Sequence, residues 1–277
     1  DAPQETMPED DALLEAAVGG IKALNNRYQS DQGRQPFYLF HRRRQYNPKE
    51  NIWMGWERKR GKLTDFNHFL LEGKTQSFDT IHGDLDFLKR VRFVITVDSD
   101  TVLPRDSANQ LIATLAHPLN QAEFEEGTQQ IKRGYSILQP RTEVKPTSVT
   151  KSFFSRVFAG DLGLDLYTRA VSDVYQDLFG EGIFVGKGIY DVAAFHQSIE
   201  GKVPENALLS HDLFEGIQGR AGLVSDIVFF EEYPPNYASQ VERLHRWVRG
   251  DWQLLPWLFP KVPSGGGKND ANPFDLI

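Results

Sequence analysis

Residues 91–104 read VRFVITVDSDTVLP, and the rest of the sequence can be interpreted outward from this stretch. Its first half is an almost wholly apolar, β-branched run, which is typical of a strand buried on both faces. Three polar residues follow at the end of that strand, Asp98, Ser99 and Asp100. Because ligands in open α/β sheets bind outside the carboxyl ends of the strands, the stretch predicts a ligand site at this point.

Asp98 and Asp100 are two residues apart, so on an extended chain their side chains point the same way, about 6–7 Å apart. Such a pair can hold a hard divalent cation against a diphosphate, directly or through water. The alternative is that the two aspartates only cap a turn and the helix that follows. That helix is expected over residues 105–117, with Pro104 at its first position. The residues alone leave both interpretations open.

Composition limits the classes of protein to consider. With 277 residues, of which 40% are hydrophobic and 12% aromatic, the chain can bury a core of one α/β domain or two small ones. A net charge of −7 makes nucleic acid an improbable partner, and the absence of cysteine excludes disulfides and thiol chemistry. The sequence contains no run of 18 apolar residues, so it predicts no membrane span, and no signal peptide is visible. Both ends resemble cut ends, so we expect a segment of a longer protein.

Strand-like and helix-like patterns alternate along the chain. Strands are expected at 36–41, 91–97, 134–140, 183–186 and 223–230. Helices are expected at 10–29, the second half of 53–71, 105–117, 148–159, 165–179, 190–199, 206–219 and 236–259. This alternation predicts an α/β fold with a mostly parallel sheet flanked by helices.

The last expected helix carries two adjoining faces. Its apolar residues are spaced for a core-facing stripe: Leu244, Val248, Trp252 and Leu255. Arg243, Arg246 and Trp247 share the next face, at i, i+3 and i+4. Two guanidinium groups beside an indole suit a phosphate next to a sugar or base. The alternative is an amphipathic helix with solvated arginines and one tryptophan in the core.

Three further segments could carry chemistry. Asp212, in the sequence SHD, begins a helix, where it is either a carboxylate general base or an acidic residue favoured by the helix dipole. Lys59 and Gly61 lie in the basic run RKRGKL near a helix start, which can bind phosphate or can be a solvated loop. Gly186 and Gly188 belong to GEGIFVGKG, which fits neither G-x-G-x-x-G nor G-x-x-x-x-G-K-[ST], so we expect these glycines to let the backbone approach a bulky ligand. The histidines lack zinc-site spacing, and no G-x-S-x-G occurs.

The order of these motifs resembles a known family. DSD, then SHD, then RLHRW follows the DxD, [TS]-E-D and Q/R-x-x-R-W order of processive inverting glycosyltransferases of the cellulose-synthase type. KRGKL is similar to their K-A-G-x-L/N segment, and FVGKG to their F-x-G-[TS]-G segment. The longer phrases FVGKGIYDVAAF and RLHRWVRGDWQLLPWL resemble the glycosyltransferase domain of bacterial cyclic β-1,2-glucan synthases. The resemblance extends from about residue 1 to residue 260.

The resemblance implies a GT-A-like domain at 1–260, lacking its first strands, and a flexible linker at 261–277. It implies transfer of glucose from UDP-glucose to a growing β-1,2-glucan with inversion. The implied site residues are Asp98 and Asp100 for Mg²⁺ or Mn²⁺, Lys59 and Gly61 along the nucleotide, Gly186 and Gly188 at the donor sugar, Asp212 as base, and Arg243, Arg246 and Trp247 at the pyrophosphate and acceptor. It further implies membrane-spanning partners in the same parent protein and a place on the cytoplasmic face of the bacterial inner membrane.

Two departures from the family pattern qualify these expectations. The residue before the expected base is His211 where the family usually has Glu, so the assignment depends on Asp212 alone. The chain also begins at what resembles the end of the second strand, so an edge of the sheet would be exposed. The rival interpretations are a non-catalytic module that binds UDP or glucan, and a membrane polysaccharide synthase of another linkage. A nucleotidyltransferase is disfavoured, since its glycine-rich basic loop is missing.

Overall fold

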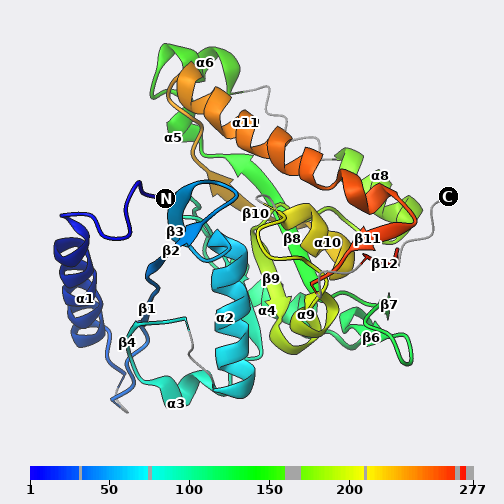
Figure 1. The fold of residues 1–277 in the computed structure, drawn as a ribbon, viewed down its shortest axis with the longest axis horizontal. Coiled ribbons are helices and arrows are strands. Elements are labelled where there is room, and N and C mark those ends of the chain that lie inside the picture. Colours follow the sequence, from blue (N-terminus) through cyan, green and yellow to red (C-terminus); the bar gives the residue numbers. More distant parts are fainter. Residues whose placement is uncertain (31–32, 74–76, 160–169, 209–210, 266–268, 273–277) are drawn as a thin grey trace. The chain divides into compact units, whose positions relative to one another are not determined.

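A computed structural model describes residues 1–30, 33–73, 77–159, 170–208, 211–265 and 269–272 (Figure 1). The chain forms two compact units, Asp1–Val91 and Arg92–Ile277. Each unit is described by itself below. In the described residues, no helix combines the length and the apolar character that crossing a membrane requires.

The first unit combines two long helices with short strands, and an aromatic cluster joins the second of these helices to the first strand. Its elements are α1 (Asp10–Arg27), β1 (Leu39–His41), β2 (Arg44–Asn47), β3 (Ile52–Gly55), α2 (Arg58–Glu72), β4 (Thr80–His82) and α3 (Leu85–Leu88). β1 pairs with β4, and β2 pairs with β3, both antiparallel. The ring of Phe40 lies 5.1–5.5 Å from the rings of Phe66, Phe69 and Phe78, so β1 packs on α2. The expected helices at 10–29 and in the second half of 53–71 are confirmed.

The second unit contains a four-stranded sheet in the order β10-β8-β9-β5. Its strands are β5 (Phe93–Thr96), β8 (Ile137–Val144), β9 (Gly188–Asp191) and β10 (Ala221–Glu231). β8 and β10 are parallel neighbours, whereas β9 runs antiparallel to both β8 and β5. Three strands therefore share one direction and β9 opposes them. The predicted α/β class is confirmed, but the sheet is mixed, because β9 is inserted between β5 and β8.

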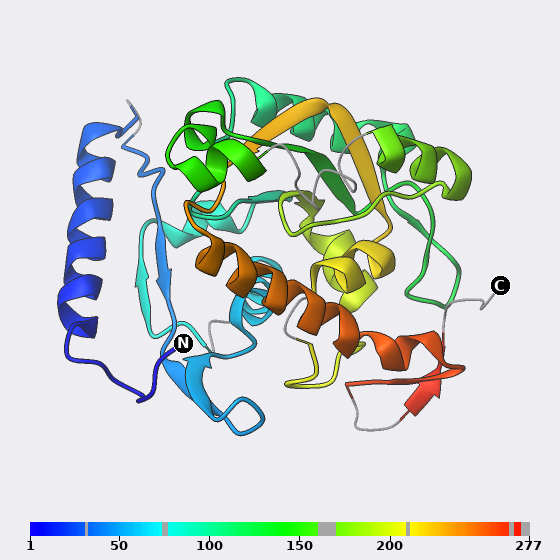
Figure 2. The same ribbon diagram turned by 90° about the horizontal axis from the view of Figure 1, so that it is seen from above.

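Helices cover both faces of this sheet (Figures 1 and 2). α4 (Ser107–Ala116) lies on one face and α9 (Val192–Ile199) and α10 (Asp212–Gln218) on the other. The core on the α4 side is formed by Leu111, Leu115, Leu138, Ile189, Ile227 and Phe229. Each of these elements contributes its apolar face to this core, as expected when a helix packs on a sheet.

The remaining elements of this unit are short, apart from the last long helix. They are η1 (Pro118–Asn120), β6 (Glu123–Phe124), β7 (Ile131–Arg133), α5 (Pro146–Val149), α6 (Phe153–Phe158), α8 (Ala170–Phe179), α11 (Tyr237–Gln253), η2 (Leu255–Leu258), β11 (Lys261–Pro263) and β12 (Asn269–Ala271). The expected helix at 148–159 is divided into α5 and α6. Residues 165–169 of another expected helix lie outside the described residues. In the expected linker, β11 pairs with β12, and residues 266–268 and 273–277 lie outside the described residues.

Two expected elements are displaced. The strand predicted at 183–186 is wrong, since the strand at this point is Gly188–Asp191. The backbone N–H of Val185 donates to the side chain of Gln139, and Gly186 has a φ of +86°, so this segment leaves the ladder. Pro104 does not begin the next helix, because α4 starts at Ser107 with Asp106 as its N-cap.

Two predicted burial patterns also differ from the structure. β5 is an edge strand among the described residues, and Val97 just beyond it is 46% exposed, so this stretch is not buried on both faces. The apolar stripe of α11 is not core-facing: Leu244 is 40%, Val248 53% and Trp252 69% exposed. Helical periodicity shows which residues share a face of a helix, but it does not show whether that face packs against another element.

Candidate functional site

The site lies at the edge of the sheet in the second unit where β5, β8 and β10 end. Because β9 is antiparallel, its first residues lie at this same edge. Thr96 at the end of β5 is in register with Gly188 at the start of β9. The hydroxyl of Thr96 donates to the carbonyls of Gly186 and Gly188, at 3.3 and 3.4 Å. Sheet topology therefore brings the DSD and FVGKG segments together.

Asp98 begins a tight turn that leads the chain across this edge. Its N–H donates to the Thr101 hydroxyl at 3.2 Å, and its carbonyl accepts from the Thr101 N–H at 3.1 Å. Val102 then pairs with Phe230 of β10, with N–O distances of 2.7 and 3.1 Å. The turn is thus closed by backbone atoms of Asp98, and the N-cap of α4 is Asp106. The Asp98 side chain is 42% exposed and Asp100 is exposed.

Lys187 is the buried cation of this edge. Its residue is only 9% exposed, and its Nζ lies 3.3 Å from Oδ2 of Asp98. The same Nζ forms a short ion pair with Oε1 of Glu231, whose side chain is 9% exposed. Burial by itself lowers the pKa of Lys187, but the negative charges of Glu231 and Asp98 outweigh it and raise that pKa above its ordinary value. Lys187 is therefore an ammonium between two carboxylates.

Asp212 contacts the same segment at Gly186, one residue before Lys187. A Cβ added to Gly186 would lie 2.6 Å from Oδ1 of Asp212, so a glycine is required for the carboxylate to approach this backbone. Gly216 follows Asp212 by one turn of α10, and a Cβ added to it would lie 2.8 Å from the Cβ of Phe184. The first and second turns of α10 thus pack directly on residues 184–186. Asp212 itself is partly exposed, with 31% of its side chain accessible.

His211 and Glu215 form a buried pair behind Asp212. Nδ1 of His211 lies 2.9 Å from Oε1 of Glu215, and 3.7 Å from Oδ1 of Asp212. The side chains of His211 and Glu215 are only 6% and 3% exposed. The i,i+4 spacing on α10 explains why they meet. These three groups offer ligand atoms within 4.8 Å of one another, so they could hold a metal ion or share a proton.

Arg243 connects α11 to this site through electrostatics. Burial lowers the pKa of Arg243, while the negative charges of Glu231 and Asp100 act in the opposite direction. Its guanidinium lies 4.9 Å from the Trp247 ring and donates to Gln240 at 2.8 Å. The predicted shared face of Arg243 and Trp247 is therefore confirmed.

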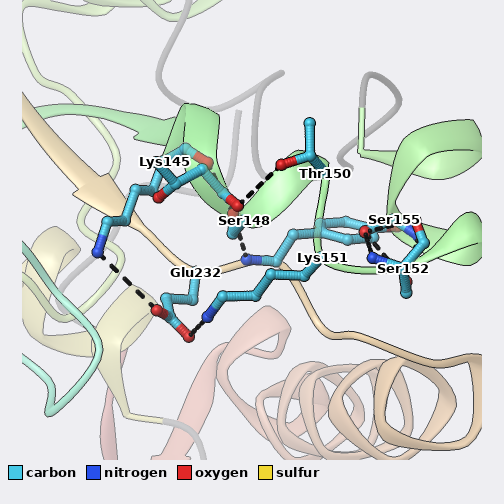
Figure 3. A network of polar contacts seen from close by, with 9 residues as sticks. Lys145, Ser148, Thr150, Lys151, Ser152, Ser155 and Glu232 are labelled. Carbon is cyan, nitrogen blue, oxygen red and sulfur yellow. Dashed lines mark hydrogen bonds and ion pairs between the residues drawn. The ribbon is translucent and has the colours of Figure 1, made fainter.

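The segment after β8 is fastened to the end of β10 next to the site (Figure 3). Nζ of Lys151 lies 2.8 Å from Oε2 of Glu232, and Nζ of Lys145 lies 4.0 Å from Oε1 (Figure 3). The Tyr233 N–H donates to the Ser148 hydroxyl at 3.2 Å. Glu232 thus pairs with Lys145 and Lys151, whereas its neighbour Glu231 pairs with Lys187.

Lys59 and Gly61 belong to the first unit, where they lie in the first turn of α2. The Gly61 N–H donates to the Glu57 carbonyl at 3.1 Å, and a Cβ on Gly61 would lie 2.1 Å from the Trp56 carbonyl. The basic run is therefore at a helix start, as predicted. A local packing requirement accounts for Gly61, and a role of Lys59 and Gly61 at a nucleotide stays a prediction.

The sequence interpretation missed Lys187, Glu231 and Glu215 as members of the site. Lys187 was visible within FVGKG, but only the antiparallel course of β9 places it against Asp98. Glu231 ends a strand, so the rule that ligands bind at carboxyl ends of strands could have identified it. Glu215 follows His211 by one helical turn, a spacing that the predicted helix already contained.

Comparison with known proteins gives one strong similarity. The chain is 46% identical over 260 residues to the cyclic beta-(1,2)-glucan synthase NdvB of Rhizobium meliloti (strain 1021). The chain is similar to one segment of a cyclic β-(1,2)-glucan synthase. The match covers 94% of this chain but only 9% of the length of NdvB. The expected resemblance to cyclic β-1,2-glucan synthases is thereby confirmed, and no protein-family model matches the chain.

Proposed function

We propose that this chain is the glycosyltransferase segment of a cyclic β-1,2-glucan synthase, which transfers glucose from UDP-glucose to a growing β-1,2-glucan with inversion. The similarity to NdvB supports glycosyl transfer to a β-glucan. The donor, the stereochemistry, the GT-A assignment of the fold and the cytoplasmic face of the inner membrane come from the resemblance of the motifs. The glucan acceptor and membrane-spanning parts of the same parent protein are the proposed partners.

One observation carries the proposal. The segment Gly186–Gly188 contacts both the expected base and the DSD motif, through two consecutive residues. Asp212 lies against Gly186, and Asp98 lies 3.3 Å from Lys187. A donor bound across this segment would place its diphosphate near Asp98 and its sugar within reach of Asp212. A transferase needs both a group at the diphosphate and a base at the sugar, so this arrangement favours a transferase.

In the proposed reaction, Asp212 accepts the proton of the acceptor hydroxyl. The hydroxyl oxygen forms a bond to the anomeric carbon while the bond from that carbon to the UDP oxygen breaks, and UDP leaves with the electron pair. A single displacement inverts the α-donor to a β-linkage, so no carboxylate nucleophile is required. Arg243 and Arg246 would balance the charge that develops on UDP, and Trp247 would support the acceptor end. Lys59 and Gly61 would lie along the nucleotide, and Gly186 and Gly188 at the donor sugar.

The carboxylates at this edge fit a hard cation. Asp98 and Asp100 offer oxygen ligands, which Mg²⁺ and Mn²⁺ prefer, on a turn that is accessible to solvent. When bound, the cation would supply positive charge at the diphosphate.

The first test is calorimetric titration of UDP into the chain, with and without Mg²⁺ or Mn²⁺. We expect metal-dependent binding that falls by more than about tenfold in Asp100→Asn, because a ligand carboxylate is lost. Asp226→Asn, which changes another exposed aspartate, on β10, serves as the control and should bind like the unmodified chain. Binding unchanged in Asp100→Asn would indicate that the DSD residues only shape a turn.

A second test separates the enzyme from a non-catalytic binding module. Asp212→Asn should keep UDP affinity and lower transfer by about 100- to 10,000-fold, as loss of a general base does. Transfer is measured as glucose incorporated from UDP-glucose, with linkage analysis of the product. Full turnover in this variant would remove Asp212 from the role of base. UDP binding without any turnover by the unmodified protein would favour the binding module.

A further inference from the structure

We infer that Lys187 is a positioning residue, which holds the Asp98 carboxylate in place for the donor diphosphate and its cation. This inference rests on the proposed function, and it concerns a residue for which the family pattern gives no role. That pattern has Ser or Thr at the fourth position of F-x-G-[TS]-G, where this chain has Lys187. An ammonium at that position changes the charge of the site.

The contacts of Lys187 show what it can do. Its side chain is 11% exposed, so the ammonium has lost most of its water. In place of water, the ammonium contacts Oε1 of Glu231 and Oδ2 of Asp98. A buried charge is retained only when partners compensate it, and two carboxylates compensate Lys187. Glu231 is the more buried partner, with 9% of its side chain exposed against 42% for Asp98.

Because they differ in burial, the carboxylates of Glu231 and Asp98 have different structural roles. Glu231, at the end of β10, anchors the ammonium, while Asp98, in the turn after β5, is held by it and still faces solvent. Lys187 therefore connects the ends of two strands that are not neighbours in the sheet. Without Lys187, the carboxylates of Asp98 and Glu231 would lose the ammonium that they share, and their repulsion would disfavour the present position of the Asp98 side chain.

Lys187 is thus expected to act through Asp98. In Lys187→Met, which keeps the length of the side chain but removes its charge, metal-dependent UDP affinity should fall by about 10- to 100-fold, the usual effect of losing a group that orients a metal ligand. Lys187→Arg should recover most of that loss. Lys151→Met is the matched control, since Lys151 pairs with the adjacent Glu232 at 2.8 Å and should change nothing (Figure 3).

The decisive measurement is a double-mutant cycle with calorimetric titration of UDP at several Mn²⁺ concentrations. If Lys187 acts through Asp98, Lys187→Met added to Asp98→Asn causes no further loss of affinity. A merely structural role would lower the unfolding midpoint without this dependence on Asp98 and Mn²⁺. Should Lys187→Met not fold, the Lys187→Met/Glu231→Gln variant, compared with Glu231→Gln, gives the same test without an unpaired buried carboxylate.

The outcomes separate the two claims. UDP affinity equal to that of the unmodified chain in Lys187→Met, or losses that add in the double variant, would overturn the inference and leave the proposed function standing. An unmodified chain that shows no metal-dependent UDP binding would overturn the proposed function and this inference together.

Discussion

Gly186 shows how one residue serves two structural requirements at the site. Its φ of +86° lies in the left-handed region, which side chains with a Cβ rarely adopt. Its missing side chain also leaves the space that the Asp212 carboxylate occupies. Gly127 has a similar φ of +76° but has no atom within 4 Å of an added Cβ. Comparing a substitution at Gly186 with the same substitution at Gly127 therefore distinguishes the cost of backbone strain from the cost of the clash with Asp212.

We expect Gly127→Ala to cost about 1 kcal/mol of unfolding free energy through backbone strain alone. Gly186→Ala should cost about 1–3 kcal/mol more, because its Cβ overlaps Oδ1 of Asp212. Transfer should fall in Gly186→Ala only, since its clash displaces the carboxylate. Denaturant unfolding and the UDP-glucose transfer assay measure the two effects. Equal costs at both positions would mean that Asp212 moves aside freely.

At the scale of an element, α11 is the helix whose environment the sequence misrepresents. Its apolar residues repeat with a helical period, yet the described residues leave Leu244 40% exposed. Leu111 of α4 obeys the same period and is completely buried. The difference lies in their neighbours: α4 packs against β8, β9 and β10, whereas the Leu244 face of α11 is accessible to solvent.

The same substitution at these two positions tests the difference. Leu111→Ala should lower the free energy of unfolding by about 2–5 kcal/mol, because it leaves a cavity in the core. Leu244→Ala should lower it by less than about 1 kcal/mol, since little apolar surface is lost from burial. Denaturant unfolding of both variants provides the measurement. A similar loss at Leu244 would show that the stripe of α11 faces the core after all.

At the scale of the molecule, most of the proposed site lies within one compact unit. Asp98, Lys187, Asp212 and Arg243 all belong to Arg92–Ile277, whereas Lys59 and Gly61 belong to Asp1–Val91. The DSD, FVGKG, SHD and RLHRW segments are separated along the chain by some 90 residues at the widest gap, between Asp98 and Lys187. The sheet brings the DSD and FVGKG segments to one edge, and α10 packs Asp212 against Gly186, which supports a shared function for these three motifs.

The sequence by itself determined the α/β class, most helices, and the motifs that resemble cyclic β-1,2-glucan synthases. These depend on local signals, namely the period of apolar residues and short polar segments at strand and helix ends. Only the tertiary structure decided that β9 runs antiparallel, that the apolar stripe of α11 is exposed, and that Lys187 lies between Asp98 and Glu231. Strand direction and the partners of a helix face depend on contacts between residues far apart in the chain. A pattern of neighbouring residues does not encode such contacts.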